Sequence, residues 1–403
     1  GFAMSGTPGR RTIILGLDGA TWDVLDGLLA AGRLPHLAGI IARGVRTTCR
    51  STVPPLSPVA WSTIATGKNP GKHGVFDWQR RDPATYRLEP VTSRRQRGPT
   101  FWDLASEAGL RAGAFNVPVT YPPGPVGGFM VTSLLTPSNR VCFTHPPEAS
   151  EALNRHVDGY EIVTPEVYSA GRERAFVDAM LRTVEKREAA LHYMLETYPI
   201  DFGLLVYNES DGIQHKLWPA DGFGEGEPPW PASGIWEVYE RLDRAVGRLA
   251  DHLGPDANLL VISDHGAGPM RGVMFVNRWL MDQGYLRLRR SPSVGLKRFL
   301  AWTDLLVRGY YLASRVGLGR LGRLFSPKTR TQVATSFISF DDVDWSRSVA
   351  YSFGSCGQVF LNLRGREREG IVEPGAEADR LLDEIAGRFR QVRDPDTGRD
   401  LIT

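Results

Sequence analysis

Short apolar runs alternate along this chain with longer segments in which apolar residues recur at helical spacing. The runs cover residues 12–17, 113–117, 202–207 and 258–263, and another follows at 359–363. Helical periodicity is present over residues 20–44, 101–108, 172–197, 235–252 and 376–390. Continuous apolar runs of this length are typical of strands buried on both faces, and strands that alternate with helices are typical of a mostly parallel, helix-covered sheet. The pattern therefore predicts an α/β fold.

Acidic residues or histidine lie just beyond three of the predicted strands, at Asp18, at Glu209 to Asp211, and at Asp264-His265. Functional groups of open α/β sheets gather beyond the carboxyl ends of the strands, so we expect these side chains to lie close together. The third strand is followed by an Asp-x3-His pair, whose spacing puts both side chains on one face if the segment is helical. Carboxylates and imidazoles are ligands of zinc and similar divalent metals. The candidate metal ligands are Asp18, Asp211, His215, Asp264 and His265.

Ser57 lies in a proline-rich loop, in the sequence Val53-Pro-Pro-Leu-Ser57-Pro. Residues 60–65 favour the start of a helix, whose free N–H groups would face a bound anion. A serine hydroxyl does not ionise near neutral pH unaided, but a metal ion bound to its oxygen lowers its pKa. We therefore predict that Ser57 is a nucleophile.

The order of these motifs resembles the alkaline phosphatase superfamily, and specifically its type I phosphodiesterase/nucleotide pyrophosphatase branch. The segments that carry the resemblance span most of the chain. They are Ile14-Leu-Gly-Leu-Asp18-Gly, Ser57-Pro-Val-Ala-Trp-Ser-Thr-Ile-Ala-Thr66-Gly-Lys-Asn-Pro70-Gly-Lys-His73-Gly-Val, Asp211-x3-His215 and Ser263-Asp264-His265-Gly266. The resemblance implies an alkaline-phosphatase-like three-layer sandwich, with a mostly parallel central sheet and a helical insert.

The resemblance also implies a site with two divalent metal ions, zinc in the first instance, with manganese or iron as alternatives. The implied ligands are Asp18, Ser57, Asp264 and His265 for one ion, and Asp211 and His215 for the second. In the family the Ser or Thr hydroxyl attacks phosphorus, and water hydrolyses the resulting covalent intermediate. The resemblance thus implies a phospho-enzyme intermediate on Ser57.

This sequence departs from the family pattern in two places. The family completes its second metal site with another histidine near the C-terminus, whereas no histidine follows His265. We expect that the 403 residues are a truncated form of a longer protein, the alternative being an incomplete second site. Family members also place an Asn soon after the His-Gly pair, to bind a phosphoryl oxygen, and here that stretch is Val75-Phe76-Asp77-Trp78. The candidate substrate contacts are Asn116, Lys68 and Lys72, with capping and solvated-surface roles as their respective alternatives.

These observations predict a metal-dependent hydrolase of phosphodiester or pyrophosphate bonds. A phosphomonoesterase, or a phosphoryl-group transferase with the same site, is the nearest alternative. A non-catalytic protein that binds a phosphorylated ligand is the alternative from another class. The expected partner is a small phosphorylated substrate, either nucleotide-like or a lipid head group. The formal net charge of only +3 does not favour a nucleic acid polymer.

Positive charge is concentrated in residues 286–330, which hold eleven Lys or Arg and one acid among aromatic and aliphatic residues. This pattern predicts a basic, amphipathic helical insert. It would act as a lid over the site, as a membrane-surface element, or as a packing module with a solvated face. The expected organisation is a tag and disordered N-terminus over 1–11, a catalytic core over 12–285, the insert over 286–340, and a continuation of the core, incomplete at its C-terminus, over 341–403.

Neither a signal peptide nor an apolar run long enough to span a membrane is present. We therefore expect a cytoplasmic protein, with peripheral membrane association through residues 286–330 as an alternative. The three cysteines are widely spaced, which argues against a disulfide framework and predicts buried, unpaired thiols. They are Cys49, Cys142 and Cys356.

Overall fold

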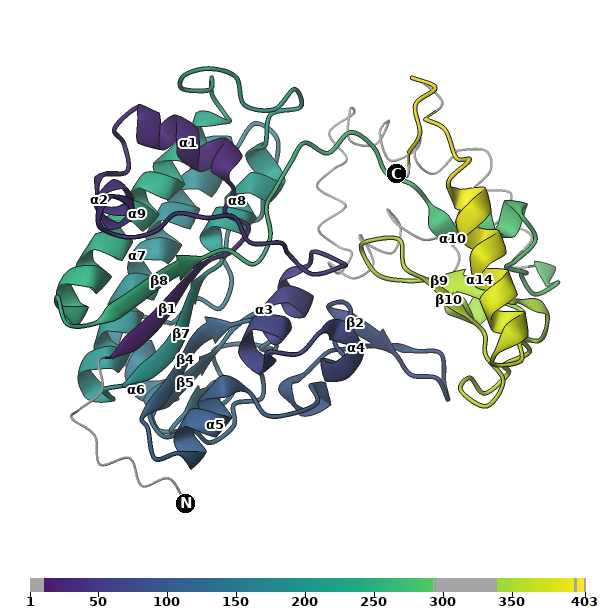
Figure 1. Cartoon of the computed structure of the whole chain (residues 1–403), viewed down its shortest axis with the longest axis horizontal. Helices are drawn as coiled ribbons and strands as arrows, with labels where there is room; N and C mark the ends of the chain where they lie inside the picture. Colours follow the sequence, from purple (N-terminus) through teal and green to yellow (C-terminus); the bar gives the residue numbers. More distant parts are fainter. Residues whose placement is uncertain (1–10, 293, 295–338, 395–396, 402–403) are drawn as a thin grey trace. The chain divides into compact units, whose positions relative to one another are not determined.

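The computed structural model describes residues 11–292, 294, 339–394 and 397–401 (Figure 1). The chain divides into two compact units. The first contains Gly1–Arg80 and Pro90–Gly272, and the second contains Arg81–Glu89 and Val273–Thr403. Most of the predicted basic insert lies outside the described residues.

The first unit is an α/β layered structure. Its strands are β1 (Thr12–Leu17), β4 (Ala112–Val117), β5 (Phe129–Thr132), β6 (Thr144–His145), β7 (Phe202–Tyr207) and β8 (Asn258–Ile262). Its helices are α1 (Trp22–Ala30), α2 (Pro35–Arg43), α3 (Ser57–Thr66), α4 (Pro70–His73), the 3-10 turn η1 (Ser93–Arg95), α5 (Phe101–Glu107), α6 (Ala149–His156), α7 (Glu173–Thr197), α8 (Glu209–Leu217) and α9 (Ser233–Leu253). The hairpin of β2 (Gln79–Arg81) and β3 (Leu88–Pro90) includes the points where the chain passes between the units.

The six strands form one sheet in the order β6-β5-β4-β7-β1-β8. All pairings are parallel except that of β5 with β6. The predicted mostly parallel sheet is therefore confirmed. Because β1 lies between β7 and β8, the carboxyl ends of these three strands meet at one edge of the sheet.

Alternation along β1 explains the two helical layers. Ile13, Leu15 and Leu17 join a cluster built with α1, α2 and α6 to α9, whereas Ile14 packs in a second cluster with α3 and α5. Figure 1 shows the same two groups of helices on opposite faces of the sheet. Gly16 is required on the α3 side, because a Cβ atom there would lie 2.2 Å from the Trp61 ring.

The predicted helix over residues 20–44 is two helices separated by a turn. Gly32 has a positive φ of 69°, which ends α1, and Pro35 starts α2 at a position where its missing N–H costs nothing. The buried carboxylate of Asp243 on α9 accepts hydrogen bonds from the backbone N–H groups of His36 and Leu37, at 3.1 and 2.8 Å. A distant side chain therefore caps α2, which sequence periodicity cannot show.

A buried ion pair fixes the start of α8. Arg187 on α7 donates from Nε to Glu209 Oε1 at 2.6 Å and from Nη1 to the Tyr160 hydroxyl at 2.8 Å. Both charged side chains are only 2% exposed. Glu209 is the first residue of α8, so the pair anchors the helix that carries Asp211 and His215.

The second unit is a small α+β cluster. Its elements are α10 (Val276–Asp282), the 3-10 turns η3 (Phe340–Asp342) and η4 (Trp345–Arg347), strands β9 (Ala350–Ser352) and β10 (Val359–Leu361), and α14 (Ala376–Phe389). The segment Arg81–Glu89 is held by a buried ion pair, in which Arg81 Nη2 lies 2.7 Å from Glu367 Oε1. The same guanidinium lies 4.5 Å from the ring centroids of both Tyr86 and Tyr351.

Among the described residues, no single helix combines the length and apolar character that a membrane span requires, and the bent pair α1 and α2 passes that test on length and composition alone.

The three cysteines form no disulfide with one another. The expectation that they are buried is wrong, because each lies in an exposed connecting segment.

The buried pair on α7 and α8 generates a stability prediction. Replacing Arg187 with Met is expected to lower the free energy of unfolding by about 3–5 kcal/mol, because Glu209 is left buried without its partner. The double variant Arg187→Met/Glu209→Gln is expected to lose less, since no unpaired charge remains. Urea unfolding measures both, with Arg182→Met, at an exposed position on the same helix, as the control. A loss in Arg187→Met no larger than in the control would contradict the assignment.

Candidate active site

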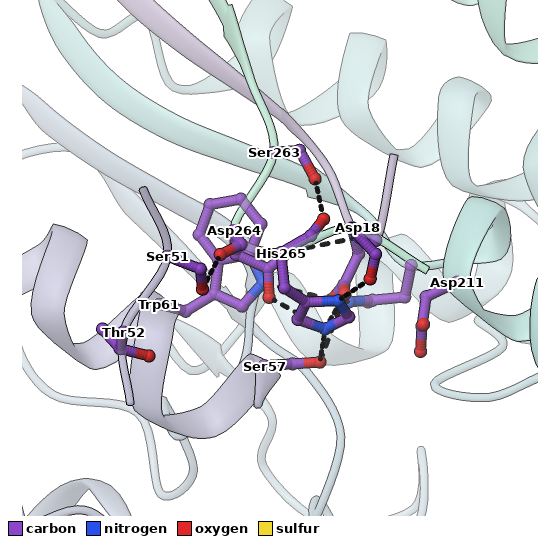
Figure 2. A network of polar contacts seen from close by, with 12 residues as sticks. Asp18, Ser51, Thr52, Ser57, Trp61, Asp211, Ser263, Asp264 and His265 are labelled. Atoms are coloured by element: carbon purple, nitrogen blue, oxygen red, sulfur yellow. Dashed lines mark hydrogen bonds and ion pairs between the residues drawn. The ribbon is translucent and has the colours of Figure 1, made fainter. Parts of the chain in front are cut away.

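Two aspartates end neighbouring strands and share one buried space (Figure 2). Asp18 follows β1 and Asp264 lies just beyond β8, and the two side chains are nearly inaccessible, at 1% and 3% exposure. The backbone N–H of Gly19 donates to Asp264 Oδ1 at 3.1 Å, which ties the two strand ends together. The Ser51 hydroxyl also holds this strand end, because it donates to the backbone carbonyl oxygen of Asp264 at 2.6 Å.

Ser57 points into the same space. Its Oγ lies 3.2 Å from Asp18 Oδ1 and 3.1 Å from His265 Nε2. The prediction that Ser57 belongs to the loop before the helix is wrong, because it is the first residue of α3. Leu56 supplies the extended cap residue and Pro58 takes a first-turn position, where proline is favoured. The hydroxyl therefore stands at the N-terminus of a helix.

The hydrogen bonds of His265 place a proton on Nδ1. This atom lies 2.8 Å from the carbonyl oxygen of Gly266, and a carbonyl can only accept. The Nε2 atom lies 3.1 Å from Ser57 Oγ, 3.5 Å from Asp18 Oδ1 and 3.4 Å from Asp264 Oδ2. An imidazole whose Nδ1–H is held by a carbonyl, with Nε2 turned into the site, has the arrangement of metal-ligating histidines.

These groups fit a cation. Asp18, Asp264 and His265 offer ligand atoms that all lie within 4.8 Å of one another, and they are the one such group of three among the described residues. Asp264 Oδ2 is buried with no hydrogen-bond partner in the described chain. Two carboxylates and one imidazole are a typical donor set for zinc, manganese or iron.

The pKa values of the two carboxylates also favour a bound cation. Burial, with a contribution from the Asp211 carboxylate, raises the pKa of Asp18 from 3.8 to about 6. Burial and the charge of Asp18 raise the pKa of Asp264 well above its ordinary value. Each carboxylate is therefore costly to ionise without a positive partner.

The two oxygens of Asp18 have different surroundings. Oδ2 accepts from Trp61 Nε1 at 3.1 Å and from Asn208 Nδ2 at 2.7 Å, while Oδ1 faces Ser57 and His265. Neither donor is among the candidate site residues that the sequence suggests. A signal for Asn208 exists, because it follows β7 directly, and Trp61 lies four positions after Ser57 on α3.

Asp211 and His215 lie on one face of α8, with Asp211 Oδ2 and His215 Nε2 3.2 Å apart. This contact with Asp211 raises the pKa of His215. Asp211 lies next to the residue that follows Asp18: a Cβ atom on Gly19 would lie 2.8 Å from Asp211 Oδ1. Gly19, at a φ of 66°, is what allows that approach. The His215 side chain remains 64% exposed.

The candidate substrate contacts are placed differently. Asn116 is fully buried and binds Asn208 rather than facing solvent. Lys68 follows the carboxyl end of α3, about 15 Å of helix away from Ser57, and Lys72 is exposed on α4. His73 is buried and forms hydrogen bonds with Thr63 Oγ1 and with the Val75 backbone N–H.

Comparison with known proteins gives one sequence match and several structural ones. A sequence model of the type I phosphodiesterase / nucleotide pyrophosphatase family matches residues 12–317. Phosphonoacetate hydrolase from Sinorhizobium meliloti 1021, solved with phosphonoacetate, is similar over 71% of this chain and 66% of that chain, with 23% identity and a TM-score of 0.51. At this identity the likeness shows a shared fold alone.

Murine ectonucleotide pyrophosphatase / phosphodiesterase 5 is 17% identical, with a TM-score of 0.43 over 70% of this chain and 65% of that chain. The chain thus spans slightly less than two thirds of the length of these solved structures. No curated protein matches the sequence significantly.

The raised carboxylate pKa values predict how metal-free stability varies with pH. Because the folded state holds a proton on Asp18 that the unfolded state releases near pH 3.8, the contribution of Asp18 to stability is greatest below that pH and is lost as pH rises through about 6. Asp18→Asn removes the ionising group. In EDTA at pH 8 the variant should be more stable than the wild-type chain by about 1–3 kcal/mol.

Thermal unfolding from pH 4 to 8, in EDTA and in zinc, tests this prediction. Zinc should raise the melting temperature of the wild-type chain and leave Asp18→Asn unchanged, because the variant lacks a ligand carboxylate. A variant that is less stable than wild type in EDTA at pH 8 would contradict the electrostatic interpretation.

Proposed function

This chain belongs to the type I phosphodiesterase / nucleotide pyrophosphatase family, and on that premise we propose that it hydrolyses phosphodiester or pyrophosphate bonds with divalent metal ions and Ser57 as nucleophile. The observation that carries the proposal is the position of the Ser57 hydroxyl. It heads a helix and lies within 3.2 Å of both Asp18 and His265, two members of the cation-binding group. The substrate is a small phosphorylated molecule.

The chain's own groups define the chemistry at this point. The Ser57 hydroxyl donates to Asp18 Oδ1 at 3.2 Å, and its Oγ lies 3.1 Å from His265 Nε2. Ser57 is the first residue of α3, and the positive end of the helix dipole favours an anion there. Ser57 Oγ would lose its proton and form the new bond to phosphorus as one ester or anhydride oxygen leaves. Water would then cleave the bond between Ser57 Oγ and phosphorus and release a phosphate monoester.

Asp18, Ser57, Asp264 and His265 would hold one metal ion, and Asp211 and His215 would contribute to a second. When bound, such ions supply charge neutralisation, a lowered hydroxyl pKa and stabilisation of charge on the transferred group. Zinc is the ion we propose, with manganese and iron as chemically compatible substitutes. Among the described residues, the second pair has no further His, Cys, Asp or Glu close enough to make a group of three, which leaves its coordination the more open of the two.

Ser57→Ala is expected to reduce zinc-dependent hydrolysis of bis(p-nitrophenyl) phosphate by at least about 10³-fold, because no group remains to form the covalent intermediate. Ser57→Thr should retain measurable turnover, since a hydroxyl is restored at the same Cβ. Ser62→Ala, on the same helix and also buried, is the matched control and should retain wild-type rates. Wild-type turnover in Ser57→Ala would exclude Ser57 as nucleophile.

Metal removal separates the reaction classes. The EDTA-treated chain should hydrolyse neither bis(p-nitrophenyl) phosphate nor p-nitrophenyl phosphate, and zinc should restore turnover of the diester. Preferential restoration of monoester hydrolysis would assign the site to a phosphomonoesterase instead. Stoichiometric zinc binding without turnover of either substrate would favour the non-catalytic binding protein.

A further inference from the structure

A series of three hydrogen bonds connects the Val206 carbonyl oxygen, through Asn116 and Asn208, to the Asp18 carboxylate, and Ser133 adds a fourth bond from the side. The Asn116 amide Nδ2 donates to the Val206 carbonyl oxygen at 2.8 Å and to Asn208 Oδ1 at 2.5 Å. Ser133 Oγ donates to the same Asn208 Oδ1 at 3.3 Å. Asn208 Nδ2 then donates to Asp18 Oδ2 at 2.7 Å.

The groups at the two ends of this series determine which atom donates and which accepts in each hydrogen bond. A backbone carbonyl can only accept, so Asn116 must turn its NH₂ group toward Val206. The same NH₂ group then faces Asn208, which must answer with its carbonyl oxygen. The Asn208 NH₂ group is left to face Asp18, whose ionised carboxylate accepts. The orientation of both amides thus follows from one fixed backbone carbonyl.

The backbone of Asn116 has an unusual conformation, which costs conformational free energy. Asn116 has a positive φ of 56° inside a strand, and the pairing of β4 with β5 passes from Phe115 to Val117 without it. Its side chain is fully buried, and its Oδ1 atom has no hydrogen-bond partner in the described chain. An unusual conformation of this kind persists only where surrounding contacts hold it, and such residues cluster at functional sites.

We propose that Asn208, oriented by Asn116, is a positioning residue that fixes Asp18 so that only Oδ1 is offered to the metal and to Ser57. Trp61 completes the arrangement, because its Nε1 donates to the same Oδ2 atom at 3.1 Å. With both donors on Oδ2, the carboxylate cannot rotate to bind through two oxygens without losing two hydrogen bonds. The inference rests on the proposed metal site, and it assigns no contact with substrate to either asparagine.

Asn208→Leu removes the donor while nearly conserving side-chain volume. Its zinc affinity, measured by competition with a chromogenic chelator, should fall roughly 10–100-fold, as expected when a group that orients a metal ligand is removed. The visible spectrum of the cobalt-substituted chain should change in band position or intensity, because the geometry of the Asp18 ligand changes. At saturating zinc, kcat for the diester should fall while KM changes little, since Asn208 does not touch substrate.

Asn116 allows the positioning role to be separated from a role in folding. Asn116→Gly removes the amide and keeps the positive φ accessible, whereas Asn116→Ala removes the amide and adds backbone strain. The positioning role predicts the same loss of zinc affinity in both variants, with a lower melting temperature for Ala. A purely structural role predicts that zinc affinity follows melting temperature instead.

Asn154→Leu is the matched control. Asn154 bridges the Asn139 carbonyl oxygen and the Tyr160 backbone N–H, at 2.8 and 2.9 Å, so its loss lowers stability without touching the site. Its zinc affinity and cobalt spectrum should match the wild type. Zinc binding by the wild-type chain is measured first, and its absence would contradict the proposed metal site and this inference together. Wild-type zinc binding with an unchanged affinity and cobalt spectrum in Asn208→Leu would overturn this inference alone.

Discussion

The repulsion between two buried carboxylates is the constraint on which the site depends. Strands β1 and β8 are parallel neighbours with Gly16 opposite Ile262, so Asp18 and Asp264 leave the sheet at the same level. The fold thereby forces two acids into one space from which water is largely excluded. Only protons or a cation can neutralise them there, because no arginine or lysine of the described chain forms an ion pair with either carboxylate.

The surrounding N–H groups bind one oxygen of each carboxylate, while the other oxygen of each carboxylate faces His265. Trp61 and Asn208 direct N–H groups at Asp18 Oδ2, and Gly19 directs one at Asp264 Oδ1. The remaining oxygens, Asp18 Oδ1 and Asp264 Oδ2, face His265 Nε2. Two carboxylate oxygens are thus held close together by donors that bind the other oxygen of each carboxylate, and this arrangement favours a positive ion over a neutral ligand.

The sequence predicts the candidate metal ligands at the strand ends better than the side chains that orient them. The apolar runs that became β1, β7 and β8 locate Asp18, Asp211, Asp264 and His265 at one edge, because parallel strands end together. The amide of Asn116 comes from β4 and that of Asn208 from the residue after β7, and no periodicity encodes such a contact. The sequence suggests Asn116 as a substrate contact, whereas the structure buries it against Asn208 at a break in strand pairing that a single sequence does not reveal. Ser57, which the sequence places in a loop, lies in the first turn of α3.

The position of β1 between β7 and β8 has a consequence for biosynthesis. Asp18 and Asn208 are 190 positions apart, and Gly19 and Asp264 are 245 positions apart. At the roughly 5–20 residues per second of translation, β1 leaves the ribosome on the order of ten to forty seconds before β7 can pair with it. During that interval β4, β5 and β6 can already associate, whereas β1 has neither of its two neighbours to join. The nascent chain therefore carries an unpaired apolar strand until β7 has been made, and chaperones that shield such strands should raise its yield.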